Sequence, residues 1–204
     1  MEIKCAQRSE EWYEIRKGKI TSSTFPDLMK SPKQRLEWNQ TQLAILRQAA
    51  AEIITGEGED HFTSKAMQWG IDNEDYGRDQ WAIENFETVR ECGFFQYSEG
   101  IGGSPDGIIT RDGKDWGVFE LKCPMSKNHL KYLLDSDELF EEYGGQVLGE
   151  AFVTGLNNYV LVSFDPRFPD GRQFVTVAGE FKAEDFITLE SRLSDAVDLI
   201  EGWL

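Results

Sequence analysis

Several features that mark other protein classes are absent or scarce in this chain of 204 residues. No apolar run is long enough to cross a membrane, and the first five residues lack the apolar block of a secretory signal. The three cysteines, Cys5, Cys92 and Cys123, are too few and too widely spaced for a disulfide framework or a zinc motif. We therefore expect a cytoplasmic protein with no membrane segment, in which the cysteines are small buried side chains.

Positive charge is also scarce, because 21 Lys and Arg residues face 37 Asp and Glu residues and leave a net charge of −16. Taken over the whole chain, this balance argues against a nucleic-acid partner. The distribution is uneven, since residues 1–35 hold eight basic and five acidic side chains, whereas the remainder holds 13 and 32. A basic N-terminal segment on an acidic body can bind an anion on one face. An acidic surface that only aids solubility gives the same composition.

Histidine occurs only twice. His61 follows an acidic loop, and His129 lies between Lys127 and Lys131 in a predicted short helix. We expect both histidines at the surface, where they act neither as ligands nor as bases. The two lysines either bind phosphates or belong to a solvated helix face.

Apolar spacing divides the chain into a helical first part, a central run of strands and a helical end. Helices are predicted after the N-cap residue Ser9 and over residues 21–28, 35–54, 63–86, 126–134, 137–153 and 182–200. Strands are predicted over residues 89–97, 108–110, 116–123, 159–164 and 174–177. This order predicts a single α/β domain over residues 1–204, with a central mixed sheet flanked by helices.

The strongest chemical signal is a pair of acids close to one lysine. Asp106 lies in the turn Ser-Pro-Asp-Gly, and Glu120 precedes Lys122 by two residues in an apolar run. Side chains at i and i+2 of a strand share one face, so Glu120 and Lys122 point together while Leu121 points into the core. Taken singly, Asp106 is ordinary turn chemistry and the pair could be a solvated strand face. A Glu–Lys pair in a buried central strand needs a partner or a function.

These residues together suit a hard divalent cation. Asp106, Glu120 and the backbone carbonyl of Leu121 offer the oxygen ligands that Mg²⁺ or Mn²⁺ takes, and the set contains no His or Cys that would favour Zn²⁺. A cation held there would lower the pKa of a bound water and offset the charge on a phosphoryl group. Lys122 would orient that water or stabilise the anionic transition state. The sequence therefore predicts metal-dependent cleavage of a phosphodiester.

The Ser-Pro-Asp-Gly turn followed by Glu-Leu-Lys-Cys-Pro resembles the motif of PD-(D/E)XK nucleases. More narrowly, it resembles that of the lambda exonuclease, or YqaJ-like viral recombinase, family. Further matches follow in order along the chain: Trp12 to Ser23, Trp69-Gly70 with Glu74, Tyr143 to Val147, and Asp165-Pro166-Arg167. The resemblance implies a restriction-endonuclease-like core. It places the sheet and catalytic core within residues 88–180 and a DNA-end-binding segment within residues 1–35.

The resemblance also implies two further residues of the metal site. Glu74 would face the cation as a ligand, directly or through water, although a solvated acidic helix face explains the same residue. Gln146 would line the site and help Lys122 to place the water, although a polar core residue bonded to backbone is the alternative.

A second group of residues is implied to hold the DNA end. Arg16 and Ser23 would bind the 5′ phosphate of the degraded strand, since a guanidinium fork suits a terminal phosphate. Trp12 and Ser104 are implied to lie at the same place. Trp12 and Arg16 are four residues apart and share one helix face, so a structural Trp covered by a surface Arg remains the alternative.

The implied activity is Mg²⁺-dependent 5′→3′ degradation of one strand of double-stranded DNA from its ends, which leaves 3′ single strands for phage-type recombination. Similar phage or prophage proteins form a ring of three subunits around DNA and work with a single-strand annealing protein. A restriction-like endonuclease on the same core and a non-catalytic DNA-end-binding module are the competing hypotheses. The intact Asp106, Glu120 and Lys122 argue against the non-catalytic module.

Overall fold

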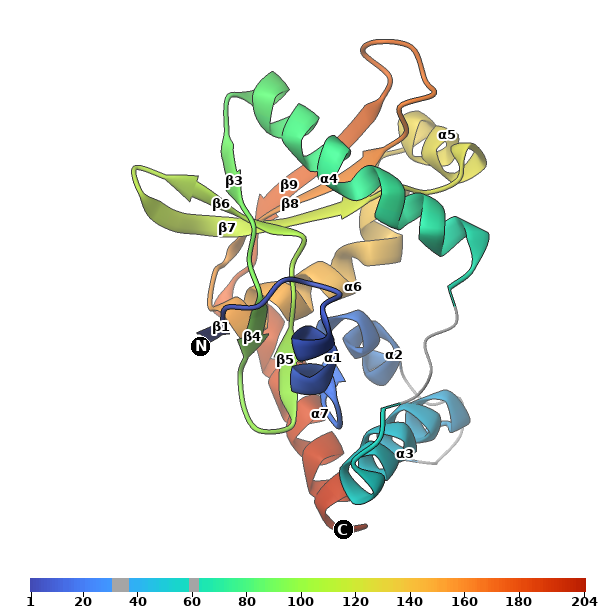
Figure 1. The fold of residues 1–204 in the computed structure, drawn as a ribbon, viewed down its shortest axis with the longest axis vertical. Coiled ribbons are helices and arrows are strands. Elements are labelled where there is room, and N and C mark those ends of the chain that lie inside the picture. The colour runs from blue at the N-terminus through green and yellow to red at the C-terminus, as the bar shows by residue number, and fades with distance from the viewer. Residues whose placement is uncertain (31–36, 59–62) are drawn as a thin grey trace.

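A five-stranded mixed sheet forms the centre of the molecule (Figure 1). A computed structural model describes residues 1–30, 37–58 and 63–204. The strands lie in the order β3 (Thr88–Arg90), β6 (Gly107–Arg111), β7 (Lys114–Lys122), β8 (Asn158–Phe164) and β9 (Phe174–Glu180). Only β7 and β8 are paired in parallel among these neighbours, and the other pairs are antiparallel. The predicted mixed sheet is therefore confirmed, with β7 as its central strand.

A second, smaller sheet lies below the first and was not predicted. It has the order β1 (Glu2–Ile3), β4 (Phe94–Gln96), β5 (Ile101–Gly103) and β2 (Ile20–Thr21). The single strand predicted over residues 89–97 is wrong, because the chain leaves the first sheet after β3 and enters the second at β4. Gly93 makes this transition possible: a Cβ atom there would lie 2.1 Å from the carbonyl oxygen of Ile3.

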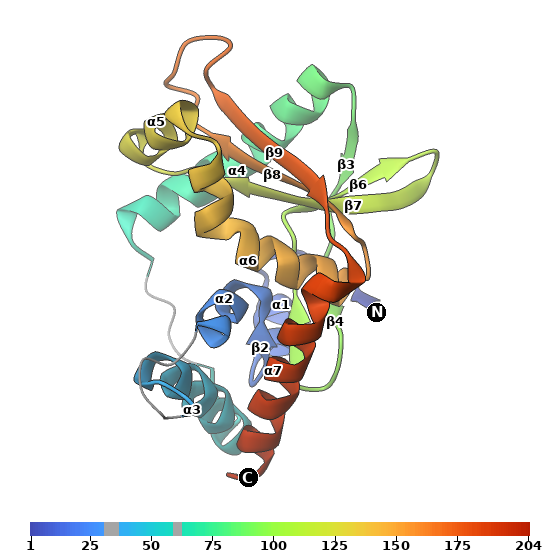
Figure 2. The ribbon, with the colours of Figure 1, turned by 180° about the vertical axis from the view of Figure 1, so that it is seen from behind.

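Helices cover both faces of the five-stranded sheet. Helix α4 (Lys65–Asn85) lies on one face, and α6 (Asp137–Thr154) lies between the other face and the short helices formed by residues 10–29 (Figures 1 and 2). Alternate residues of β7 pack on opposite faces of the sheet, against α4 or against α6. Phe119 and Leu121 pack in an apolar cluster with Trp81 of α4, whereas Val118 packs in the larger cluster that includes α6.

The remaining helices agree with the sequence within a few residues, and side-chain caps at Ser9 and Asn39 mark where two of them begin. They are α1 (Glu10–Arg16), a 3₁₀ turn (Ser22–Thr24) leading into α2 (Phe25–Met29), α3 (Gln40–Thr55), α5 (Ser126–Leu134) and α7 (Ala183–Glu201). The helix predicted from residue 35 begins later, at Gln40, because Asn39 caps it with a reciprocal capping box. Residues 35 and 36 lie outside the described part of the chain. In that part no helix is long and apolar enough to cross a bilayer.

His129 is fully buried, so its predicted place at the surface is wrong. Its Nδ1 lies 2.8 Å from Ser163 Oγ of β8, and its Nε2 lies 2.9 Å from the carbonyl oxygen of Arg172. The flanking lysines misled the prediction, because residues 127 and 131 can face solvent while residue 129 faces the sheet. His61 falls outside the described residues. Cys92 and Cys123 are buried as expected, whereas Cys5 is only partly buried.

Candidate active site

The β6–β7 hairpin brings the two predicted acids together. Asp106 immediately precedes β6, whose Gly107 pairs with Phe119 of β7, next to Glu120. The Leu121 N–H donates to Asp106 Oδ2 at 2.8 Å, and the Asp106 N–H donates to Glu120 Oε2 at 3.4 Å. Glu120 is buried, and Leu121 packs into the core on the opposite face. The predicted arrangement of these side chains on β7 is thus observed.

Lys122 and Gln146 complete a closed hydrogen-bond network around Glu120. Lys122 Nζ lies 2.5 Å from Glu120 Oε1 and 3.1 Å from Gln146 Oε1. Gln146, from α6, donates its Nε2 to Glu120 Oε1 at 2.6 Å and to Glu150 Oε1 at 2.9 Å. The orientation of the Gln146 amide is therefore fixed from three sides. Sequence reasoning missed the fully buried Glu150, which only its i+4 spacing from Gln146 could have indicated.

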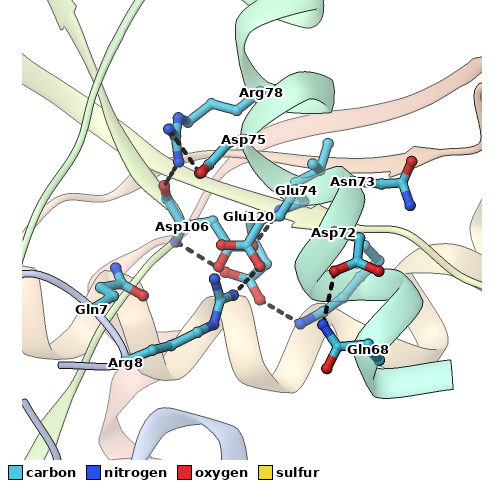
Figure 3. Close-up of polar contacts among 12 residues, drawn as sticks. Gln7, Arg8, Gln68, Asp72, Asn73, Glu74, Asp75, Arg78, Asp106 and Glu120 are labelled. Carbon is cyan, nitrogen blue, oxygen red and sulfur yellow. Dashed lines mark hydrogen bonds and ion pairs between the residues drawn. The ribbon is translucent and has the colours of Figure 1, made fainter. Parts of the chain in front are cut away.

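Helix α4 delivers Glu74 to the same place from the other side of the sheet (Figure 3). Its side chain is only 14% exposed and forms an ion pair with Arg8. The acidic neighbours turn away, since Asp72 accepts from Gln68 and Asp75 pairs with Arg78. Glu74 is thus separate from the solvated acidic face that was the alternative interpretation.

Negative charge exceeds positive charge in this cluster. Burial, followed by repulsion from Asp106, raises the pKa of Glu74 to about 7. Burial, followed by repulsion from Glu120, raises the pKa of Asp106 to about 8, and the same two causes raise that of Glu150 well above its usual range. Burial alone would lower the pKa of Lys122, but the adjacent carboxylates outweigh it and raise that pKa. A bound divalent cation would relieve this excess of negative charge.

The donor set fits a cation that keeps part of its water shell. Asp106, Glu120 and the backbone carbonyl of Leu121 are hard oxygen donors, as Mg²⁺ requires. Among the described residues, no group of three or more Asp, Glu, His or Cys side chains forms a ready-made cage. Mg²⁺ is commonly held by one or two carboxylates with several waters, so an incomplete protein shell suits it better than Zn²⁺.

A cavity of about 710 Å³ lies beside α1 and contains part of the predicted end-binding group. Arg16, Lys19, Thr21, Ser23 and Gln48 are among the residues that line it. The acidic Glu14 and Glu52 also reach the cavity, so its charge is mixed.

A chain of contacts leads from Arg16 through Trp12 to the turn that carries Asp106. The Arg16 guanidinium stacks on Trp12 with 4.1 Å to the ring centroid, and its Nη2 donates to Thr21 Oγ1 at 3.3 Å. Burial lowers the pKa of Arg16 to about 10, which leaves it charged near neutral pH. Trp12 Nε1 donates to Ser104 Oγ at 2.9 Å, and Ser104 lies two residues before Asp106. The Trp12–Ser104 hydrogen bond therefore ties α1, which contributes Arg16 to the cavity, to the turn that carries Asp106.

Comparison with known proteins shows to which family the chain belongs. A family model for the YqaJ-like viral recombinase domain matches residues 11–157, which include Asp106, Glu120, Lys122, Gln146 and Glu74. The chain belongs to the YqaJ-like viral recombinase family. The matched range ends before β8 and begins after Arg8, so the ion pair on Glu74 comes from outside it.

Solved structures of similar fold extend the likeness over nearly the whole chain. LHK-Exo in complex with dAMP is 28% identical, with a TM-score of 0.82 and coverage of 95% of this chain and 93% of that one. The alkaline exonuclease LHK-Exo from Laribacter hongkongensis is also 28% identical, with a TM-score of 0.78 and coverage of 96% of this chain and 96% of that one. A phage-related exonuclease from Haemophilus somnus is 16% identical, with a TM-score of 0.73 and coverage of 91% of this chain and 94% of that one. At this identity the likeness supports the fold alone. No match is found among curated proteins. The fold of this YqaJ-like chain is thus the predicted PD-(D/E)XK fold.

Proposed function

We propose that this protein is a Mg²⁺-dependent 5′→3′ exonuclease that degrades one strand of double-stranded DNA from its ends and leaves 3′ single strands for strand-annealing recombination. The observation that carries the proposal is the hydrogen-bonded cluster of Asp106, Glu120, Lys122 and Gln146 at the end of β7 in a chain of this family. The exonuclease names of the similar solved structures support the same reaction class.

In this mechanism Asp106, Glu120 and the Leu121 carbonyl would hold the cation, with Glu74 as a further ligand, directly or through water. When bound, Mg²⁺ would act as a Lewis acid on the phosphoryl group and lower the pKa of the attacking water. Lys122 donates a hydrogen bond to that water or to the phosphoryl oxygen on which charge develops. Gln146 keeps the Lys122 ammonium in place by accepting from Nζ while it donates to Glu120.

End recognition is proposed for the cavity beside α1. Arg16 would bind the terminal 5′ phosphate, with a hydroxyl donor from Ser23 in the same cavity. Trp12 and Ser104, which are bonded to each other outside the lining of the cavity, would contact the end from the side of the acidic cluster. The contact between Trp12 and Ser104 would then set the distance between the held end and the acidic cluster. This arrangement suits an enzyme that removes nucleotides one after another from an end.

Three further parts of the proposal depend on the family resemblance. The protein would assemble as a homotrimeric ring, thread the duplex through it, and pass the 3′ strand to a single-strand annealing protein. Light scattering on the purified protein tests the ring, which should give three times the chain mass of 23.3 kDa. A monomer at working concentration would remove the ring from the proposal and leave the chemistry intact.

Digestion of matched linear and covalently closed circular duplexes tests the proposed activity. With Mg²⁺, the linear duplex should be degraded while the closed circle stays intact, and neither should be cut in EDTA. Nicking of the circle would favour the restriction-like endonuclease. Binding to linear ends without release of nucleotides would favour the non-catalytic module.

A further inference from the structure

A short segment before α1 is fixed against the acidic cluster by side-chain contacts. Gln7 donates its Nε2 to the carbonyl oxygens of Cys92, at 3.1 Å, and of Pro105, at 2.8 Å. Ser9 caps α1 by accepting from the Trp12 N–H. The backbone of Arg8, between these two anchors, has φ of +63°, a conformation that non-glycine residues rarely adopt. Sparse conformations of this kind persist where the surrounding structure imposes them.

The imposed conformation places the Arg8 guanidinium on Glu74, 66 residues away in the chain. Among the described residues, Glu74 is the one hydrogen-bond partner of this guanidinium, which has five N–H donors. The side chain is 36% exposed. Its other N–H donors have no protein partner in the described part of the chain.

Arg78, one turn after Glu74 on α4, is a second arginine beside the acidic cluster and serves as a comparison for Arg8. Its side chain is only 7% exposed and pairs with Asp75 and Glu91, while Nη1 donates to the carbonyl oxygen of Asp106 at 3.4 Å. Arg78 has no comparable freedom to bind a ligand. The two arginines on the same cluster therefore differ in what their donors can reach.

Arg8 connects the start of α1 with the acidic cluster. Figure 3 shows its side chain extending from the N-terminal segment towards the carboxylates of Glu74 and Glu120. Helix α1, which carries Trp12 and Arg16, begins two residues later. The terminal phosphate and the next phosphate of a strand are one nucleotide apart. With the 5′ phosphate held at Arg16, as proposed, we infer that the first internal phosphate lies at the cluster that Arg8 borders.

We propose that Arg8 is a catalytic residue that binds a non-bridging oxygen of the scissile phosphodiester while it remains paired with Glu74. This inference rests on the proposed exonuclease function. Arg8 makes and breaks no covalent bond: it donates hydrogen bonds to the phosphate and offsets the charge that grows there during attack. Glu74 orients the guanidinium, so the pair acts as a positioned phosphate clamp.

A substrate modified at one phosphate tests this role directly. Two 5′-phosphorylated duplexes are compared, one with a phosphodiester and one with an uncharged methylphosphonate as the first linkage of the degraded strand. Dissociation constants are measured with Ca²⁺ in place of Mg²⁺ to slow cleavage, and single-turnover rates on the phosphodiester duplex are measured with Mg²⁺. Arg8→Asn removes the guanidinium and keeps a residue that tolerates positive φ. Arg111→Ala, which removes another arginine paired with a glutamate, is the matched control.

We expect the wild-type protein to bind the phosphodiester duplex more tightly than the methylphosphonate duplex. In Arg8→Asn this preference should fall by about tenfold, the loss of one charge-assisted hydrogen bond, and the single-turnover rate by roughly 10². Arg111→Ala should keep both values. If Arg8 only neutralises Glu74, Arg8→Asn will change binding of both duplexes equally, which overturns the proposal. Failure of the wild type to degrade the linear duplex would instead overturn the proposed function itself.

Discussion

Glu120 uses both carboxylate oxygens within the cluster. Oε1 accepts from Lys122 and Gln146, and Oε2 accepts from the Asp106 N–H. Its side chain is 1% exposed, and a buried carboxylate that is so fully engaged is costly to assemble for stability alone. A role in holding a cation, with Lys122 fixed beside it, would explain why the protein bears this cost.

Neutral isosteres of the two central acids test their role. Glu120→Gln and Asp106→Asn should abolish Mg²⁺-dependent cleavage while leaving fold and DNA binding largely intact, because size and most hydrogen bonds are kept. Asp72→Asn, an exposed acid on α4 bonded to Gln68, is the control and should be fully active. Nucleotide release and circular dichroism measure the two properties. Retained activity in either central variant would refute the metal assignment.

Arg16 is tested by the chemistry of the DNA end. Arg16→Ala should erase much of any preference for 5′-phosphorylated over 5′-hydroxyl duplexes, since stacking on Trp12 holds this guanidinium at the cavity proposed for the phosphate. The initial rates on the two ends give the ratio. Arg47→Ala, an exposed arginine that does not line the cavity, should keep the wild-type ratio. An unchanged ratio in Arg16→Ala would make Arg16 a structural surface residue.

The raised pKa values of Glu74, about 7, and Asp106, about 8, predict how pH affects the metal-free protein. Their usual pKa values are 4.5 and 3.8, so between about pH 4 and 8 the folded state binds more protons than the unfolded state. The free energy of unfolding therefore falls as pH rises through this window. On the proposed assignment, Mg²⁺ would bind the ionised carboxylates and offset this loss.

Thermal unfolding with Mg²⁺ and with EDTA at several pH values measures this linkage. The increase in Tm that Mg²⁺ causes should be small at pH 6, grow through pH 7 to 8 and level off above that. The Glu120→Gln variant should show a reduced increase at every pH. A Mg²⁺ effect that is independent of pH, or largest at pH 6, would contradict the assignment of these carboxylates to the cation.

At the scale of elements, helix α4 depends on a close approach to the sheet. A Cβ atom at Gly77 would lie 2.5 Å from Phe164 Cδ1 and 2.9 Å from Leu121 Cδ2, so the helix packs directly on β7 and β8 at this point. Glu74 lies one turn earlier on the same helix. The short distance at Gly77 therefore sets how far Glu74 reaches into the site.

Gly77→Ala should destabilise the protein by about 1–3 kcal/mol through overpacking, and it should lower activity because α4 and Glu74 shift together. Gly70→Ala provides a control on the same helix. A Cβ atom there meets nothing within 4 Å, so it should stabilise the protein by about 0.5–1 kcal/mol and leave activity unchanged. Urea unfolding and nucleotide release measure both effects. Equal stabilities for the two variants would show that the close approach at Gly77 has no energetic weight.

The elements also show which parts of the fold are readable from sequence. Helices α1 and α4 begin after Ser9 and Ser64, whose side chains cap them, and such signals are local. The two-residue strands β1 and β2 carry no such signal, because only pairing with distant segments defines them. The places of Asp106 and Glu120 were predictable because turn chemistry and strand alternation determine them, whereas Glu74 was indicated only by the family resemblance. Arg8 and Glu150 were not predictable. The role of Arg8 depends on an ion pair with a residue far away in the sequence, and that of Glu150 depends on which face of α6 is turned towards the site.

At the scale of the whole molecule, the uneven charge has a structural counterpart. The N-terminal segment, within the basic residues 1–35, contributes β1 to the second sheet, holds the Asp106 turn through Gln7, and carries Arg16 on α1. It also brings the guanidinium of Arg8 to the acidic cluster through the ion pair with Glu74. The net charge of −16 resides mainly on the rest of the chain. An acidic body would disfavour DNA contact outside that site.

Digestion of linear duplexes labelled at either the 5′ or the 3′ end of one strand, with Mg²⁺ and with EDTA, tests the proposed 5′→3′ exonuclease activity. We expect immediate Mg²⁺-dependent release of the 5′ label as a mononucleotide, late release of the 3′ label, and no release in EDTA. Early release of the 3′ label, or release of either label without a divalent cation, would contradict it.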